Sequence, residues 1–454
     1  MSDTLYDALV IGGGPAGSTT AYSLAREGLK VLLLEKETHP RFHIGESFLP
    51  RNITLLKDLG LWDRLMQLPH VVKYGAEFAF GNQSDDTTMH FRFDSGIPVG
   101  NTVAFNIERA PLDAMLLSAA KDAGALVREN TAVKQIVDLA DGRVAVKTDE
   151  GETLRANWLC DASGHGTVVG RHLNTKRVHP DHRKIAYYAH FTGVKRKDMP
   201  VGGYPTIVMC DEGWFWVIPL DETRTSIGMV FDADLAKTVN VAPAQMLLWG
   251  IERCPLVRSR LEHASCPELN HVTADFSYRC APFAGPGYFL IGDAATFIDP
   301  IFSTGACLAM MAGVQAAERI VKLVRTPANA GALRSSYIHF VEAATSRYFR
   351  LIHMYYHHSF RELFMEGQGP MQVEKAVISL LAGHVFPPGP PWSIRWRMKL
   401  FEACMVLNKY LPLVPKRPHH SLRAATPDPL PGRKPVSAIE AKVARHAPSG
   451  AGVL

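Results

Sequence analysis

A glycine-rich segment near the N-terminus has the spacing of a loop that binds a dinucleotide. Gly12, Gly14 and Gly17 follow the apolar run 8–11 and precede a helical pattern that ends at Gly28. The first glycine permits a tight turn, the second lets the backbone approach a pyrophosphate, and the third allows a helix to pack closely on a strand. The helix N-terminus then offers free N–H groups to the anion. The segment predicts a dinucleotide site, with a structural glycine-rich turn as the alternative.

An acidic residue closes the next apolar run. Residues 31–34 are typical of a buried strand and end on Glu35, which is placed to accept hydrogen bonds from the ribose hydroxyls of an adenosine. Strand, turn, helix and strand together span about 30 residues, and this context separates a nucleotide site from a chance glycine pattern. Ala16 and Lys36 are expected to contact the same ligand.

Residues farther along the chain could also bind or react with small molecules. Asp293 follows a short apolar run and a glycine. Trp214 and Trp216 stand two residues apart on an expected strand, so both indoles face the same side. Lys73 lies on another expected strand. Taken alone, the tryptophans are typical of a core pair and the lysine of a solvated surface.

These signals together resemble the superfamily of FAD-dependent monooxygenase-like proteins. The segment around Asp293 is similar to its second fingerprint, in which the aspartate hydrogen-bonds the ribityl chain. Arg109 matches an arginine near the cofactor, and residues 160–164 resemble an internal Asp-Gly signature. The resemblance implies that the dinucleotide is FAD. No second glycine-rich loop has a strand before it and a helix after it, so the sequence offers no separate site for NADH.

Further segments resemble the flavin-dependent halogenases, in the branch that acts on phenols and pyrroles. W-x-W-x-I-P at 214–219 is similar to the diagnostic motif of that family, whose aromatic wall keeps the substrate away from the flavin. Lys73 resembles the essential lysine, and residues 297–305 resemble the family's D-P-x-x-S-x-G segment. The branch's flavin-contacting loop corresponds to Gly45, Glu46 and Ser47. The resemblance runs from residue 7 to residue 365.

The resemblance implies a reaction and its partners. FAD, reduced by a separate NAD(P)H-dependent flavin reductase, would react with O2 and oxidise chloride or bromide to hypohalous acid. Lys73 would then donate a hydrogen bond to that acid from its ammonium or form a haloamine, beside an electron-rich aromatic ring. The sequence leaves open whether the ring is free or tethered to a carrier protein, and it contains no evident base for the ring proton.

The halide is expected where residues 303–305 open a helix, because backbone N–H groups there form an anion nest. The halide residues are Ser303, Thr304 and Gly305, and the flavin contacts there are Gly305 and Ala306. An ordinary helix start capped by Ser303 is the alternative.

Composition limits the remaining classes of protein. The 454 residues are 47% apolar and 20% charged, which excludes a disordered chain and a fibre. The net charge of +5 is too small to imply nucleic acid, and it comes from residues 411–454, which hold seven basic and two acidic side chains. Seven scattered cysteines without a CxxC pair predict neither disulfides nor a metal site. Without a signal peptide or a membrane-spanning run, we expect a cytoplasmic protein.

The elements that must position these residues predict an α/β fold. We expect a Rossmann-like FAD-binding domain (GR2/PHBH-like flavoprotein monooxygenase fold) with an interleaved antiparallel substrate sheet and a helical C-terminal region. The expected FAD-binding domain spans 1–330 discontinuously, at 1–75, 100–175 and 275–330, and the substrate sheet takes 76–99 and 180–274. Residues 331–412 are expected to be helical, and 413–454 to form a flexible, basic, Pro-rich tail. The amphipathic stretch 392–410 could pack on the body, cover the substrate mouth, or dock a carrier or a membrane.

Three other functions remain open from the sequence. The first is an aromatic hydroxylase, which would not need Lys73 or the tryptophan wall. The second is a reductase of isoprenoid double bonds, which shares the Gly-Asp signature. The third is a degenerate flavin-binding scaffold in a biosynthetic complex.

Overall fold

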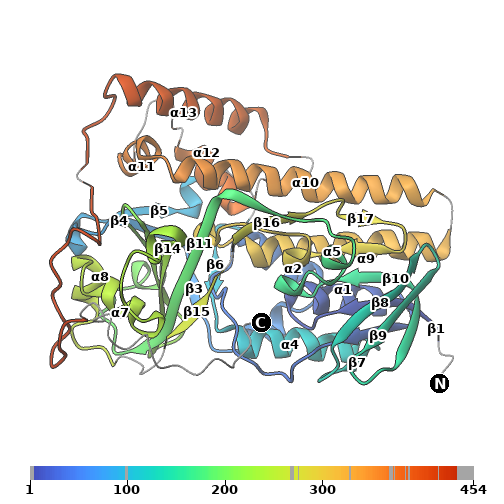
Figure 1. The fold of residues 1–454 in the computed structure, drawn as a ribbon. Helices are drawn as coiled ribbons and strands as arrows, with labels where there is room; N and C mark the ends of the chain where they lie inside the picture. The colour runs from blue at the N-terminus through green and yellow to red at the C-terminus, as the bar shows by residue number, and fades with distance from the viewer. Residues whose placement is uncertain are drawn as a thin grey trace.

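The apolar runs near the N-terminus form the centre of a parallel sheet (Figure 1). The computed structural model describes residues 5–97, 101–265, 270–274, 276–326, 329–367, 372, 374–383, 385–386, 389–417 and 419–436. The sheet contains, in order, β17 (Ala284–Gly285), β18 (Tyr288–Leu290), β10 (Thr153–Asp161), β1 (Leu5–Ile11), β2 (Val31–Leu34) and β7 (Leu126–Arg128). All of these strands except β17 run parallel. Because the carboxyl ends of parallel strands share one edge, Gly12, Glu35 and the segment before Asp293 meet there.

An antiparallel meander extends this sheet. β8 (Val133–Ala140) pairs with β9 (Arg143–Thr148), and β9 pairs with β10. The helices α1 (Pro15–Arg26), α4 (Arg109–Asp122) and α9 (Gly305–Arg325) cover the sheet, and α1 packs against the other two (Figure 1). A Cβ on Gly313 of α9 would lie 2.7 Å from the Thr20 hydroxyl, so this glycine lets α9 cross α1 closely.

The second sheet is antiparallel for most of its width and lies beside the first (Figure 1). Its strands are, in order, β19 (Thr296–Phe297), β16 (Phe276–Cys280), β11 (Lys176–Thr192), β14 (Arg224–Asp232), β13 (Gly213–Pro219), β12 (Thr206–Met209), β4 (Gly75–Phe80) and β5 (Met89–Arg92), with β15 (His271–Thr273) on β11. A small separate sheet pairs β3 (Val71–Lys73) with β6 (Ala104–Asn106). The predicted α/β class is therefore confirmed.

Shorter helices fill the connections between these elements. They are α2 (Pro50–Asp58), α3 (Trp62–Met66), α5 (Val168–His172), α6 (Ala233–Ala236), α7 (Met246–Ile251) and α8 (Pro255–Arg260). The C-terminal helices α10 (Ala330–Tyr355), α11 (His358–Met365), α12 (Glu374–Ala382) and α13 (Trp392–Tyr410) lie along the top of the molecule in Figure 1. Among the described residues, no helix is both long and apolar enough to cross a bilayer.

The prediction of a flexible tail from residue 413 is wrong for the segment 419–436. Leu422 and Leu430 are buried in the core beside the second sheet. The carboxylate of Glu212 accepts hydrogen bonds from the backbone N–H groups of Leu422 and Arg423, and Glu252 does the same for Val436. The segment is fixed by hydrogen bonds from its backbone to the carboxylates of Glu212 and Glu252. Such contacts leave no periodic pattern of apolar residues in the sequence. Residues 437–454 lie outside the described part of the chain.

This segment also brings together three side chains that the sequence separates widely. Cys210, Cys254 and His420 are buried, and the atoms they could offer to a metal lie within 4.8 Å of one another. Burial raises the pKa of the Cys210 thiol, and contact with Cys254 raises it further. These shifts favour neutral, packed thiols.

Candidate active site

A cavity of about 1000 Å³ reaches from the glycine-rich loop to the second sheet. Its wall includes sixteen of the residues that the sequence singles out: Gly12, Gly14, Ala16, Glu35, Lys36, Gly45, Glu46, Ser47, Arg109, Trp214, Trp216, Asp293, Ser303, Thr304, Gly305 and Ala306. Gly17 and Lys73 are not among the residues that line it. One continuous space therefore joins the predicted dinucleotide site to the tryptophans and to the start of α9.

The glycine-rich loop has the geometry of a ligand cradle. Gly12 has a φ of +101°, and a Cβ there would lie 2.3 Å from the Ala162 carbonyl oxygen. A Cβ on Gly17 would lie 1.8 Å from the Gly12 carbonyl oxygen, so Gly17 serves the packing of α1 on the loop. A Cβ on Gly14 in contrast would meet only the Arg41 guanidinium, at 3.7 Å, and Gly14 precedes Pro15 at a helix start without a side-chain cap. The first N–H groups of α1 are thus available to a pyrophosphate, and the loop fits FAD.

Glu35 both shapes the loop and faces the cavity. Its buried carboxylate accepts hydrogen bonds from the N–H groups of Gly13, at 2.5 Å, and Glu37, at 2.9 Å. Lys36 is mostly exposed at the same end of the cavity. Arg41 is a lining residue that the sequence reasoning missed, and its guanidinium lies 3.9 Å from Glu35. A cation beside Gly14 suits a phosphate, but Arg41 lies just before the Gly45–Ser47 loop and is not part of the motif itself.

Arg109 ties the start of α4 to the loop that contains Gly45. Its guanidinium makes a two-bond pair with Asp113, at 2.8 and 2.9 Å, and donates to the Ile44 carbonyl oxygen. Gly45 has a φ of +104°, and a Cβ there would lie 3.0 Å from Arg109. Burial lowers the pKa of Arg109, but the charge and hydrogen bond of Asp113 outweigh it, so this arginine stays a fixed cation.

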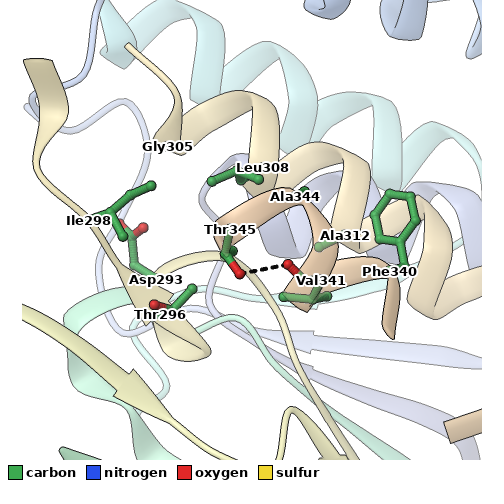
Figure 2. Close-up of a pocket in the computed structure, with 11 residues that line it drawn as sticks. Asp293, Thr296, Ile298, Gly305, Leu308, Ala312, Phe340, Val341, Ala344 and Thr345 are labelled. Atoms are coloured by element: carbon green, nitrogen blue, oxygen red, sulfur yellow. Dashed lines mark hydrogen bonds between the residues drawn. The ribbon is translucent and has the colours of Figure 1, made fainter. Parts of the chain in front are cut away.

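Asp293 lies on a partition between the cavity and a small pocket against α10. Figure 2 shows Asp293, Thr296, Ile298 and Gly305 on one side of that pocket, with Phe340, Val341 and Thr345 on the other. The pocket encloses about 20 Å³, and the Thr345 hydroxyl is satisfied by the Val341 carbonyl at 2.7 Å. It is therefore a packing gap. Burial raises the pKa of Asp293, although His165 and Arg109 oppose the shift.

Glu46 connects the cofactor loop to the second sheet. Its Oε1 lies 2.6 Å from Nε2 of His190 on β11, a residue that the sequence reasoning missed. Burial lowers the pKa of His190, but the hydrogen bond and charge of Glu46 outweigh burial and raise it. The other carboxylate oxygen, Oε2, is buried and has no hydrogen-bond partner in the part of the chain that the structure describes. A buried acceptor that lacks a donor in a cavity wall suits a ligand with an N–H or O–H group.

Lys73 is buried rather than solvated. Its Nζ donates to the Ser47 hydroxyl at 2.9 Å and to the Phe48 carbonyl oxygen at 3.0 Å, and it lies 5.5 Å from the Phe93 ring centre. Burial alone lowers the pKa of Lys73 to about 7. Because Ser47 lines the cavity, the Ser47 hydroxyl lies between the Lys73 ammonium and the cavity.

Trp214 and Trp216 form one wall of the cavity, as the strand spacing predicts. Their ring centres are 5.8 Å apart. Trp216 donates to the Ser226 hydroxyl at 3.1 Å, and its indole occupies the space that a Cβ on Gly228 would take, at 2.2 Å. Trp214 donates to the hydroxyl of Tyr356 at 3.2 Å. Each indole is therefore fixed by a hydrogen bond at its edge.

The segment before α9 departs from a capped helix start. Ser303 has a left-handed φ of +57° and does not cap α9. Thr304 takes the N-cap position, and its buried hydroxyl has no hydrogen-bond partner among the described residues. A Cβ on Gly305 would meet nothing within 4 Å. The alternative of a start capped by Ser303 is wrong. The buried hydroxyl of Thr304 and the first N–H groups of α9 lie beside open space at Gly305, an arrangement that suits an anion.

Comparisons with known proteins agree with this geometry. The sequence profile of the FAD binding domain family matches residues 5–339. The chain is 33% identical over 327 residues to the 1H-pyrrole-2-carbonyl-(peptidyl-carrier protein) brominase of Pseudoalteromonas luteoviolacea, with 70% of this chain and 78% of the brominase covered. It is 28% identical over 382 residues to the corresponding chlorinase of Pseudomonas fluorescens, with 78% and 84% covered.

Solved structures give the same result. The structure of the flavin-dependent brominase Bmp2 superposes with a TM-score of 0.77 at 29% identity, and covers 88% of this chain and 99% of its own. The myxobacterial chondrochloren halogenase CndH superposes with a TM-score of 0.71 at 28% identity, with 91% and 98% covered.

Proposed function

The chain belongs to the flavin-dependent halogenases, and from that premise we propose that it halogenates an electron-rich phenol or pyrrole with chloride or bromide. The observation that carries this proposal is Lys73, a buried amine held against the cavity by Ser47, with no carboxylate within ion-pair distance among the described residues. Burying an amine without a carboxylate partner lowers the stability of the folded protein, so a role in packing alone does not explain this lysine.

Bound FAD, in its reduced form, would supply the reaction with O2 that oxidises a halide to hypohalous acid. The residues proposed to hold it are Gly12, Gly14, Ala16, Gly17, Glu35, Lys36, Gly45, Glu46, Ser47, Arg109, Asp293, Gly305 and Ala306. Gly14 and the first turn of α1 would receive the pyrophosphate, and Glu35 the ribose hydroxyls. The N-terminus of α9 would favour negative charge nearby, because its dipole is positive there.

The halide would bind at Ser303, Thr304 and Gly305. The unpartnered Thr304 hydroxyl and the free N–H groups of the first turn of α9 would donate to it. The left-handed Ser303 bends the chain so that this turn faces the cavity.

Lys73 would act on the hypohalous acid. In the ammonium form, two of its three N–H groups bond to Ser47 and Phe48, which leaves one for the acid. That hydrogen bond polarises the oxygen–halogen bond toward an aromatic carbon. Trp214 and Trp216 would limit how closely the ring approaches the flavin, because their indoles are held in the cavity wall by hydrogen bonds.

The partners follow from the same cavity and from the relatives. Two relatives act on pyrrole-2-carbonyl groups carried by a peptidyl carrier protein, and we propose a ring of this electronic type for this chain. We also propose that a separate NAD(P)H-dependent flavin reductase supplies reduced FAD in the cytoplasm.

The test supplies purified protein with FAD, a generic flavin reductase, NADH, O2 and bromide or chloride. Phenols, free pyrrole-2-carboxylate derivatives and the same acyl group on a carrier protein are offered in turn. We expect a halogenated product by mass spectrometry, lost in Lys73→Ala while FAD remains bound. A hydroxylated product without halogen, or turnover that ignores the halide, would support a hydroxylase and overturn the proposal.

A further inference from the structure

Exposed apolar side chains gather on α13 and on the residues that directly follow it. Of sixteen exposed large apolar side chains in the described part of the chain, six lie between residues 392 and 413, with exposures from 41% to 76%. They are Trp392, Val406, Leu407, Tyr410, Leu411 and Leu413. Scattered single residues of this kind need no explanation, but a cluster does.

The helix period separates two faces of α13. Ile394, Phe401 and Asn408, spaced by seven residues, are buried toward α11 and α12. Residues 392, 399, 403, 406 and 410 recur every three to seven positions on the other side and are exposed. Packing on the body therefore explains one face of α13 only. The outer face needs a different partner.

Basic side chains are interleaved with this apolar face. α13 contains four basic residues and one acid, and that acid, Glu402, forms an ion pair with Arg350 on α10. Arg395, Lys399 and Lys409 are exposed among the apolar residues. Arg397 lies over the Trp396 ring at 4.6 Å. Basic residues with tryptophan at one end and tyrosine at the other are typical of a helix that lies in a lipid interface.

We propose that the outer face of α13 binds the surface of an anionic lipid bilayer. The positive charge of α13 complements anionic headgroups. Its exposed aromatic and aliphatic side chains would insert among the lipids while the helix lies flat on the bilayer surface. A second copy of this chain fits less well, because a two-fold interface would bring two basic faces together. A carrier protein fits less well because no α13 residue lines the cavity, and α10, α11 and α12 lie below α13 (Figure 1).

The experiment uses the full chain and vesicles of phosphatidylcholine with or without phosphatidylglycerol. Flotation should recover the protein with the anionic vesicles only, and added salt should weaken the binding. The double variant Trp392→Ala/Tyr410→Ala and the double variant Arg395→Glu/Lys399→Glu should each weaken partitioning by about tenfold or more. All four residues are exposed, so the fold is retained, which the melting temperature checks.

Matched controls change similar residues elsewhere on the surface. Val137→Ala/Met199→Ala removes two exposed apolar side chains, and Lys147→Glu/Arg155→Glu reverses two exposed charges on the meander. Both should bind vesicles like the unaltered protein. Binding to neither kind of vesicle, or equal losses in test and control variants, would overturn the proposal. So would a change from dimer to monomer, or loss of halogenation of a carrier-bound ring only, in the α13 variants.

Discussion

The hydroxyl of Tyr356, just after α10, donates to Oδ2 of Asp299 across 2.5 Å. The same hydroxyl accepts the indole N–H of Trp214, and the backbone N–H of Ile301 donates to the other carboxylate oxygen. Asp299 is 3% exposed and lines the cavity. The Tyr356 hydroxyl, from the C-terminal helical region, therefore orients two side chains of the cavity wall, Trp214 and Asp299.

Tyr356→Phe should destabilise the protein by about 1–3 kcal/mol, because Oδ2 of the buried Asp299 carboxylate and the indole N–H of Trp214 each lose their hydrogen bond. The ratio of halogenated product to NADH consumed should fall, since Trp214 is no longer fixed. Urea denaturation and product analysis measure the two effects. Tyr22→Phe removes a phenol whose hydrogen bond, within the described residues, is to the Leu59 carbonyl, and should leave the ratio unchanged. Equal ratios in both variants would contradict the role of Tyr356.

Lys73→Met should abolish halogenation and raise stability near pH 7. The pKa of Lys73 is about 7 in the folded protein and 10.5 ordinarily, so between these values the unfolded chain binds a proton that the folded chain lacks. Stability therefore rises with pH across that window, and the lysine costs most below pH 7. The expected gain is about 2 kcal/mol at neutral pH, because lost hydrogen bonds offset part of it.

The gain in Lys73→Met should shrink toward pH 10, which urea denaturation at both pH values measures. Lys197→Met is the contrast, since Lys197 pairs with the buried carboxylate of Glu77 and its loss should destabilise. A Lys73→Met protein that is less stable at every pH would show that the amine has a structural role.

Glu46→Gln should lower stability more at low pH than at high pH. Glu46 raises the pKa of His190 above 6.5, so the ion pair contributes fully below that value and its contribution is lost as pH rises through the raised pKa. We expect a difference of about 1–2 kcal/mol near pH 6 that has largely vanished near pH 9. Glu212→Gln, whose partners are backbone N–H groups and the Ser421 hydroxyl, should show no such trend in thermal melts.

Gly228→Ala tests the role of Trp216 by changing the residue against which its indole packs. The new methyl group would lie 2.2 Å from the Trp216 ring, so the indole must move. This overpacking should lower the free energy of unfolding by about 1–3 kcal/mol. FAD affinity should stay unchanged while halogenation falls, as fluorescence titration and product analysis can show. Gly331→Ala at the start of α10 meets nothing within 4 Å and should behave like the unaltered protein.

Thr304→Val should raise the KM for bromide several-fold and leave FAD affinity and stability nearly unchanged, because the buried Thr304 hydroxyl has no protein partner to lose. Steady-state kinetics at varied bromide measure the effect. Thr345→Val, in the packing gap, removes a satisfied hydroxyl and should leave the KM unaltered. An unchanged bromide KM in Thr304→Val would remove this residue from the halide site.

The spacing of residues along the sequence was enough to predict the features that depend on local backbone geometry. Gly12, Gly17 and Glu35 belong to a strand–turn–helix–strand unit whose geometry allows few other residues, and Trp214 and Trp216 follow the two-residue period of a strand. The start of α9 near residue 304 and the helix at 392–410 also follow from periodicity and end signals.

Contacts between distant segments were decided only by the tertiary structure. Glu46 meets His190 across 144 residues, and Tyr356 meets Asp299 across 57. The docking of segment 419–436 on Glu212 spans more than 200 residues. None of these pairs has a periodic signature, because each depends on how two sheets and a helical layer are placed. The sequence by itself thus determined the nucleotide loop and the family motifs, while packing decided that Lys73 is buried with a lowered pKa and which side chains hold the cavity walls.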